Sequence, residues 1–207
     1  MNIRTGGASM SENDVVRLPE VVVFAGPNGS GKSTITRMAK IGGEYINADD
    51  IKSATLCTDL EAAVKAEELR ERMLVDRKDF TFETVLSTDR NLLLLQRAKE
   101  KGYFIRGIYV LTCNADINVA RVNAREALGG HGVPEEKIRS RYDKALALIP
   151  KFVEICDILH IYDNTQEPFR SSTRFMRPAR SKRRLITKTG PVKSTACVRQ
   201  KMRCPCA

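Results

Sequence analysis

The chain has 207 residues, of which 42% are hydrophobic and 29% charged, so it can build one well-buried domain and is too short for two ordinary ones. Its apolar stretches are short and interrupted, which excludes a membrane span and a secretory signal and predicts the cytoplasm as its compartment. The net charge of +10 resides in residues 171–207, which hold eleven Lys and Arg and no Asp or Glu; the rest of the chain, at −1, gives no electrostatic reason to expect a nucleic-acid partner.

Residues 1–19 are polar and without periodicity, and we expect them to form a flexible lead-in. From residue 20 to 170, apolar runs typical of buried strands alternate with amphipathic segments typical of helices. Strands are expected at 21–25, 44–49, 79–86, 103–112 and 158–162, and helices from about 33 and at 59–78, 90–101, 115–128 and 134–154. This alternation predicts an α/β fold whose parallel sheet carries helices on both faces. Such sheets bind ligands beyond the carboxyl ends of their strands.

The last segment, residues 171–207, breaks this pattern. Its apolar residues are scattered singly and its charges have one sign. We expect it to be disordered and to lie outside the fold, so that the sheet ends with the strand at 158–162 and leaves an exposed edge. Two interpretations of the segment stay open: an altered end of the chain, or a basic arm that binds nucleic acid.

The first expected strand leads into a glycine-rich loop, GPNGSGKS, which matches the phosphate-binding pattern G-x-x-x-x-G-K-[ST] at every fixed position. In such loops, backbone N–H groups and a helix N-terminus surround the β-phosphate. Lys32 can then reach the β- and γ-phosphates, and the Ser33 hydroxyl can bind Mg²⁺. A chance glycine-rich turn is the alternative, but the strand before the loop and the helix after it favour the phosphate site. The predicted ATP-binding residues are Gly26, Pro27, Asn28, Gly29, Ser30, Gly31, Lys32, Ser33 and Thr34.

The loop does not define the reaction, because transporter ATPases, GTPases and kinases share it. The string GPNGSGKST is typical of ABC-type ATPases, but the sequence lacks their LSGGQ-like signature and their apolar strand ending in Asp-Glu. It also lacks the NKxD-type motif with which GTPases read the base. These features favour a kinase that uses ATP and Mg²⁺ to phosphorylate a hydroxyl of a small molecule.

Candidate acceptor-side residues follow two of the expected strands. Asp49 and Asp50 close the strand at 44–49, where a carboxylate can orient the acceptor hydroxyl and take its proton. An Asp at that place can also cap the next helix, and we expect one of the pair to cap and the other to be catalytic, with Asp49 favoured as the base and Asp50 near the substrate. Glu83 is predicted to grip the acceptor's hydroxyls with the help of Thr84; the alternative is an edge residue that faces water.

Arg121 and Arg125 lie four residues apart, on one side of their helix and just before a Gly-Gly turn. They suit a mobile lid that closes on the triphosphate and neutralises the charge developing during transfer. An ordinary basic helix face is the alternative for Arg125. Arg141, nearer than Arg139 to the apolar side of the next helix, is a further candidate for substrate binding. His131 at the lid tip is explained equally well as a ligand contact or as a polar turn residue.

Together these segments resemble the zeta toxin family of P-loop kinases over about residues 20–170. The resemblance rests on AGPNGSGKST (25–34), INADDI (46–51), FETVLS (82–87), RVNAREALGGHGVP (121–134), IRSRY (138–142) and YDN (162–164). The order of the later segments is more specific than the phosphate loop. The resemblance implies an adenylate-kinase-like P-loop NTPase core, ATP-dependent phosphorylation of the sugar of UDP-N-acetylglucosamine, and a cognate antitoxin protein that holds the enzyme in check.

The positions that match the family's functional residues are Lys32 and Ser33 for the phosphates and Mg²⁺, Asp49 as the base, Glu83 for the acceptor, and Arg121 and Arg125 before the lid. The chain departs from the family at two places. His131 stands where the best-known members have a further lid arginine. After residues 168–170, an Arg-, Ser- and Cys-rich segment replaces an ordered one.

Two other functions stay open. One is a metabolic kinase for another sugar or a nucleotide. The other is a degenerate P-loop module that holds nucleotide and signals through its basic tail to RNA or a membrane. The complete set of Lys32, Ser33, Asp49 and Glu83 argues against degeneracy.

Overall fold

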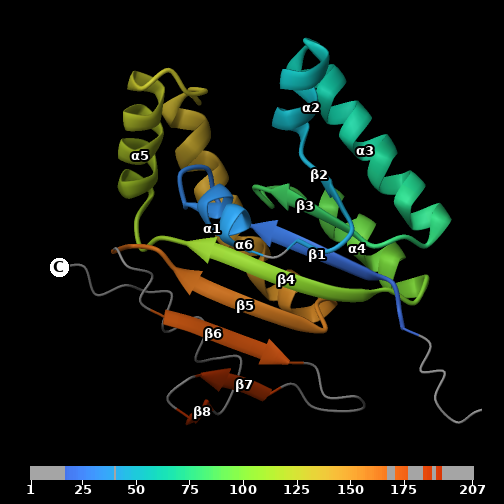
Figure 1. Ribbon diagram of the computed structural model, residues 1–207. Coiled ribbons are helices and arrows are strands. Elements are labelled where there is room, and N and C mark those ends of the chain that lie inside the picture. Colours follow the sequence, from blue (N-terminus) through green and yellow to red (C-terminus); the bar gives the residue numbers. More distant parts are fainter. Residues whose placement is uncertain (1–16, 40, 167–170, 177–183, 188–189, 193–207) are drawn as a thin grey trace, which may run out of the picture.

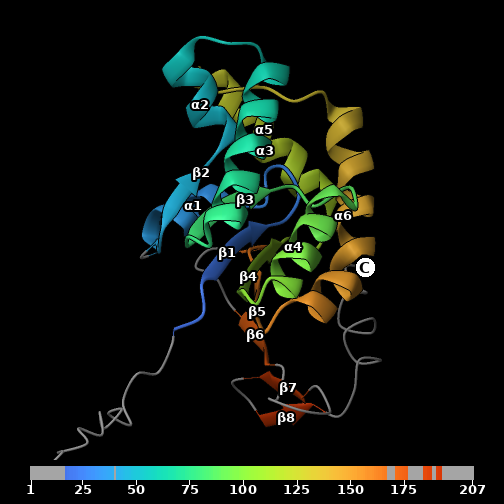
Figure 2. The same ribbon diagram turned by 90° about the vertical axis from the view of Figure 1, so that its right-hand side faces the viewer.

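The computed structural model describes residues 17–39, 41–166, 171–176, 184–187 and 190–192. These residues form one eight-stranded sheet in the order β2-β3-β1-β4-β5-β6-β7-β8, with six helices (Figures 1 and 2). The strands are β1 (Glu20–Ala25), β2 (Glu44–Ile46), β3 (Phe80–Thr84), β4 (Phe104–Leu111), β5 (Ile158–Asp163), β6 (Ser171–Met176), β7 (Arg184–Thr187) and β8 (Gly190–Val192). The helices are α1 (Lys32–Met38), α2 (Ala48–Thr55), α3 (Asp59–Asp76), α4 (Arg90–Glu100), α5 (Ala115–Ala127) and α6 (Glu135–Ile155). None of the described helices is long and apolar enough to cross a membrane.

Strands β1 to β5 are parallel, with β1 in the middle between β3 and β4. Alternate residues of β1 and β3, among them Val23 and Phe82, are fully buried and share one core with Leu95 of α4 and Phe152 of α6. Helices α4 and α6 cover this face of the sheet, and α1 lies on the opposite face (Figure 1). The predicted α/β architecture with helices on both faces is therefore confirmed.

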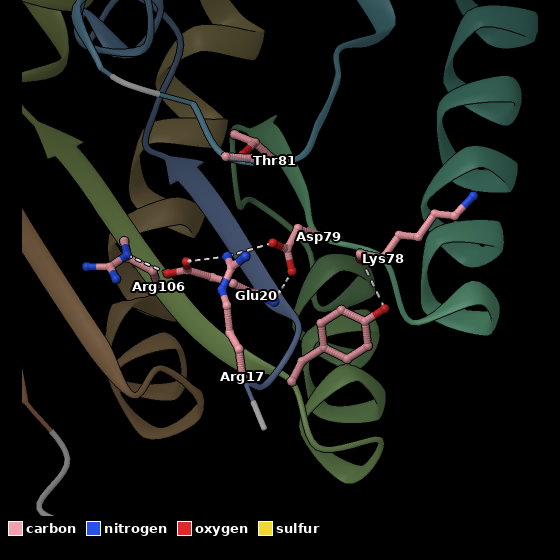
Figure 3. A network of polar contacts seen from close by, with 8 residues as sticks. Arg17, Glu20, Lys78, Asp79, Thr81 and Arg106 are labelled. Carbon is pink, nitrogen blue, oxygen red and sulfur yellow. Dashed lines mark hydrogen bonds and ion pairs between the residues drawn. The ribbon is translucent and has the colours of Figure 1, made fainter. Parts of the chain in front are cut away.

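A polar network fixes the amino ends of the three central strands (Figure 3). The carboxylate of Asp79 accepts hydrogen bonds from the Arg17 guanidinium and from the backbone N–H of Glu20, both at 2.7 Å. The Glu20 carboxylate accepts one from Arg106 at 2.6 Å. The network thus joins the starts of β1, β3 and β4, at the edge of the sheet opposite to the phosphate loop.

Helix α2 has no counterpart among the helix ranges predicted from the sequence, and the strand before it is shorter than expected. The second strand ends at Ile46 rather than at Asp49, and the N-cap of α2 is Asn47, whose side chain accepts a hydrogen bond from the backbone N–H of Asp49 at 3.0 Å. The expectation that Asp49 or Asp50 caps the helix was wrong, because the amide oxygen of Asn47 already satisfies the first turn. Both carboxylates lie exposed in that first turn, where the helix dipole favours negative charge.

The sheet continues past the point where the sequence predicted its end. Strand β6 pairs antiparallel with β5 along its whole length, and β7 and β8 extend the sheet further. Phe175 of β6 is 8% exposed and belongs to the main core. The expected exposed edge at β5 was therefore wrong, since β6 covers it. Residues 1–16 of the predicted lead-in and residues 193–207 of the basic tail lie outside the described residues.

Candidate active site

The phosphate loop connects β1 to α1 and packs tightly against two other elements. Gly29 and Gly31 have positive φ angles of 75° and 94°. A Cβ on Gly29 would lie 2.4 Å from the backbone oxygen of Asn118 in α5, and one on Gly31 would lie 2.3 Å from the side-chain nitrogen of Asn164 after β5. Both glycines are therefore required by conformation and by space, as expected for a loop that curls around a phosphate.

Two buried asparagines donate hydrogen bonds to backbone oxygens of the loop. The sequence analysis assigned neither of them a role. Asn118 donates from its amide to the backbone oxygen of Asn28 at 2.6 Å and accepts from the hydroxyl of Thr112. Asn164 donates to the backbone oxygen of Ser30 at 2.8 Å. Both side chains come from segments that follow parallel strands, β4 and β5. Parallel sheets bind ligands beyond the carboxyl ends of their strands, and these ends lie at the same edge of the sheet. The position of both asparagines beside the phosphate loop could have been inferred from this rule.

Lys32 interacts electrostatically with three other charged residues of the predicted site. Its half-buried ammonium donates to the backbone oxygen of Pro27 at 2.9 Å. Loss of hydration lowers the pKa of Lys32 to about 8; Glu83 and Asp49 act in the opposite direction, and the positive charge of Arg125 adds to the lowering. Four predicted site residues, Lys32, Asp49, Glu83 and Arg125, are therefore close enough to interact electrostatically.

Glu83 lies beside the phosphate loop. One of its carboxylate oxygens accepts from the Ser33 hydroxyl at 3.0 Å, and the other accepts from the Tyr45 hydroxyl at 2.8 Å. Asn47 in turn donates to the phenol oxygen of Tyr45 at 3.1 Å. This half-buried, fully engaged carboxylate is not an edge residue that only faces water. The sequence analysis assigned no role to Tyr45 or Asn47, because their pattern is typical of an ordinary strand end.

Thr84 has a local structural explanation. Its hydroxyl oxygen accepts hydrogen bonds from the backbone N–H of Leu86 at 3.0 Å and from the side chain of Asn91 at 2.7 Å. These contacts shape the turn from β3 to α4, in which Leu86 has a positive φ of 56°. Binding of the acceptor by Thr84 stays a prediction.

The arginines predicted for the lid differ in their surroundings. Arg121 is half-buried, and its Nη1 atom is inaccessible to solvent and has no hydrogen-bond partner among the described residues. Arg125 donates to the backbone oxygen of His131 at 2.6 Å and so ties α5 to the loop before α6. Arg139 is exposed and paired with Asp116 at 2.6 Å. A buried guanidinium nitrogen without a partner is a position that an anionic ligand can satisfy.

A cavity of about 290 Å³ lies between α2 and the loop before α6. Its lining residues are Lys52, Ser53, Leu56, Cys57 and His131. Lys52 and Ser53 follow Asp49 by three and four residues on the same helix, so the cavity lies on the side of the predicted base. Asp50 is exposed in the first turn of α2. Arg141 is half-buried on α6, and no hydrogen bond or ion pair joins it to another described residue.

The residues at the loop fit a nucleotide with its magnesium ion. The Ser33 hydroxyl gives its hydrogen to Glu83, which leaves its lone pairs for a metal. The following helix points its N-terminus at the loop, and Lys32 supplies positive charge there. We assign Lys32 and the loop backbone to the phosphates and Ser33 to the metal as the arrangement to be tested.

Comparison with known proteins shows a shared fold. No family model matches the chain. An uncharacterized protein of Haemophilus influenzae is 28% identical over 129 residues, covering 59% of this chain and 92% of its own. A structure from the PezAT chromosomal toxin–antitoxin system of Streptococcus pneumoniae matches with a TM-score of 0.54 and 18% identity, covering 75% of this chain and 72% of its own.

Two further structures are similar at lower coverage of their own chains. A chain of the AvrRxo1-ORF1:-ORF2 complex with ATP matches with a TM-score of 0.62 and 13% identity over 91% of this chain. A chain of the Pnkp1/Rnl/Hen1 RNA repair complex matches with a TM-score of 0.56 and 17% identity over 69% of this chain. The present chain spans 64% and 49% of the lengths of these two. At such identities the similarity establishes the fold alone, which is the α/β P-loop fold.

Proposed function

We propose that this chain is an ATP- and Mg²⁺-dependent kinase that phosphorylates a hydroxyl of a small molecule, with a nucleotide sugar such as UDP-N-acetylglucosamine as the leading acceptor. The observation that carries the proposal is the contact of the Glu83 carboxylate with Ser33, next to Lys32, at a loop that fits a nucleotide. Asp49 and Arg125 lie within electrostatic range of Lys32. The P-loop fold shared with the structures named above is consistent with it.

The reaction can be written with the residues of this site. Asp49 accepts the proton of the acceptor hydroxyl, whose oxygen forms a bond to the γ-phosphorus. The bond between the γ-phosphorus and the bridging oxygen breaks, and ADP leaves with that electron pair. Lys32 and the two lid arginines, Arg121 and Arg125, offset the negative charge on the transferring group. Bound Mg²⁺ supplies further positive charge at the β- and γ-phosphates.

The cavity beside α2 supports an acceptor with a sugar-sized part and an anionic part. Its volume is close to the lower end of the range for ligand pockets. Lys52 is paired with Asp59 at 2.6 Å and retains two further N–H donors for an anion. His131, on the other wall, offers a ring nitrogen. We assign the acceptor's hydroxyl to the Asp49 end of this cavity and its phosphate groups to Lys52 and His131.

Phosphotransfer from γ-labelled ATP to a panel of nucleotide sugars, sugars and nucleosides tests this function. Asp49→Asn should lower kcat by about 10²–10⁴-fold and leave ADP binding nearly intact, since the base acts on the acceptor. Asp50→Asn is the comparison, one residue away in the same exposed turn; because Asp50 is predicted to lie near the substrate, its loss should raise the KM for the acceptor and leave kcat nearly unchanged. Full turnover of the Asp49 variant with loss in the Asp50 variant would move the base by one residue.

We propose a protein antitoxin as a partner on the resemblance to zeta toxins, and a similar structure comes from a toxin–antitoxin system. Induced expression of the chain in bacteria should then arrest growth, and the Lys32→Ala variant at equal protein level should not. Normal growth with both proteins would remove the reason to search for an antitoxin, whereas the kinase assay would still stand by itself.

A further inference from the structure

Strand β2 at the edge of the sheet carries a tyrosine that the reaction above does not use. In the parallel pairing of β2 with β3, Tyr45 stands opposite Thr81 and Ile46 opposite Phe82. Because side chains alternate along a strand, Tyr45 projects from the same face of the sheet as Glu83, two residues beyond Thr81. The ring is half-buried, and its hydroxyl reaches the Glu83 carboxylate at 2.8 Å.

The direction of each hydrogen bond around Tyr45 can be assigned. An ionised Glu83 only accepts, so the phenol donates its hydrogen to the carboxylate. The phenol oxygen accepts from the amide of Asn47 at 3.1 Å. Burial and the nearby negative charge of Glu83 raise the pKa of Tyr45, so the hydroxyl keeps its hydrogen. The phenol is thus held by one acceptor and one donor.

These bonds connect the nucleotide side of the site, at Ser33, with the acceptor side, at the helix that carries Asp49. Glu83 receives a hydrogen bond from Tyr45 on one oxygen and from Ser33 on the other, so both oxygens of the carboxylate are held. With Glu83 fixed, the hydrogen of the Ser33 hydroxyl points to Glu83 and away from the place of the metal. Asn47, at the other end, is the N-cap of the helix that carries Asp49.

We infer that Tyr45 is a positioning residue for phosphoryl transfer: its hydroxyl holds Glu83 against Ser33 and, through Asn47, ties that carboxylate to the helix bearing Asp49. The inference rests on the proposed kinase function for its effect on turnover. Its effect on the Ser33 hydroxyl is independent of the acceptor and of transfer. The alternative is that the Tyr45 hydroxyl contributes to the stability of the sheet edge and to nothing else.

Two tyrosines of this chain allow a matched comparison. Tyr45→Phe removes the hydroxyl and keeps the ring against β3. Tyr103→Phe removes a buried hydroxyl that donates to the backbone oxygen of Met73 at 2.7 Å, far from the phosphate loop. The Tyr103 hydroxyl also contacts the backbone oxygen of Lys78 at 3.2 Å, so each variant loses a hydroxyl with two hydrogen-bond partners, and a general effect of such a loss on stability appears in both. Only Tyr45→Phe should alter the chemistry at Ser33.

The experiment measures binding of a fluorescent ADP analogue with and without Mg²⁺, together with kcat, KM and melting temperature for both variants. In Tyr45→Phe, the strengthening of binding by Mg²⁺ should shrink by about 10-fold and kcat should fall by about 10–100-fold. Metal-free binding should change little, and the KM for ATP, which is measured with Mg²⁺ present, should rise by up to about 10-fold. Tyr103→Phe should keep the wild-type metal-free binding, strengthening of binding by Mg²⁺, kcat and KM. Only its melting temperature should be lower.

A second variant separates capping from positioning. Asn47→Ser retains an oxygen that can cap α2 but cannot reach Tyr45, and it should reproduce part of the Tyr45→Phe defect and add little to it in the double variant. Wild-type Mg²⁺ dependence in a folded Tyr45→Phe protein would overturn the inference. If wild-type protein phosphorylates no acceptor, the kinase proposal fails, but the Mg²⁺ dependence of ADP binding still decides the role of Tyr45.

Discussion

Lys32 is the residue on which most charges of the site act. In the free protein its pKa is lowered to about 8, with loss of hydration as the largest cause. A bound triphosphate brings opposite charge next to the ammonium and raises its pKa again. Above pH 8, nucleotide binding must therefore take up a proton, and below pH 7 it need not.

The affinity for ATP should consequently fall as the pH rises above about 8, by up to about tenfold per pH unit. Titration calorimetry between pH 7 and 9.5, in buffers of different ionisation enthalpy, measures both the affinity and the proton uptake. Lys32→Arg is the control, because a guanidinium stays charged over this range and should remove the uptake. An equal pH dependence in that variant would assign the titration to another group.

Arg121 and Arg139 offer a second comparison of residues, two arginines with contrasting partners. The Nη1 atom of Arg121 is buried without a partner in the described part of the chain, whereas Arg139 is paired with Asp116 and Glu135 at the surface. Arg121→Gln should lower kcat by about 10²–10³-fold with a smaller effect on ADP affinity, because its charge is needed most during transfer. Arg139→Gln should leave both nearly unchanged. An unaltered kcat for Arg121→Gln would make it an ordinary helix residue.

At the scale of elements, the phosphate loop depends on helix α5 and on the end of β5 for its shape. Asn118 reaches a loop residue 90 positions earlier in the chain, and Asn164 reaches one 134 positions earlier. The loop is thereby held before any ligand binds, which reduces the ordering that binding requires.

Replacement of Asn118 by Ala should damage both stability and nucleotide binding. It leaves the backbone oxygen of Asn28 without its side-chain donor, and it leaves the Thr112 hydroxyl with only the longer hydrogen bond to the backbone oxygen of Asn114 at 3.2 Å, at a cost of about 1–3 kcal/mol. ADP should bind about tenfold more weakly, equivalent to 1.4 kcal/mol. Asn114→Ala, which removes the N-cap of the same helix, should lower stability by about 1 kcal/mol and spare ADP binding. Equal ADP affinities in the two variants would show that α5 does not support the loop.

The elements that could be predicted are those with a local signal. The strand, loop and helix around residues 21–38 follow from one motif and its flanks, and β3, β4, α5 and α6 follow from periodicity. The contacts of Asn118 and Asn164 have no such signal, because each depends on which strands are neighbours. The N-cap of α2 was misassigned because Asn47, Asp49 and Asp50 are all good capping residues within four positions.

At the scale of the whole molecule, the C-terminal strands change the interpretation of the sequence. Strand β6 carries Arg174, exposed, next to Phe175, 8% exposed and packed in the main core. The two apolar residues of this strand, Phe175 and Met176, are adjacent and follow only Ser, Thr and Arg, so they give no alternating period and the segment resembled a disordered tail. Pairing along all of β5 supplies the stability that its composition does not reveal.

A chain that ends at residue 170 should therefore be less stable than one that ends at residue 192. The truncation removes every hydrogen bond between β5 and β6 and withdraws Phe175 from the core, and Phe175→Ala alone should cost about 3–5 kcal/mol. For a domain of this size that is a decrease in melting temperature of roughly 6–20 °C. Arg174→Ala, on the exposed side of the same strand, should change stability by no more than about 0.5 kcal/mol. Calorimetry gives the melting temperatures of the four proteins, which are the two chain lengths and the two single variants. These temperatures decide whether β6 belongs to the folded domain. If the chain ending at residue 170 melts at the same temperature as the longer one, the folded domain ends before β6, as its composition first suggested.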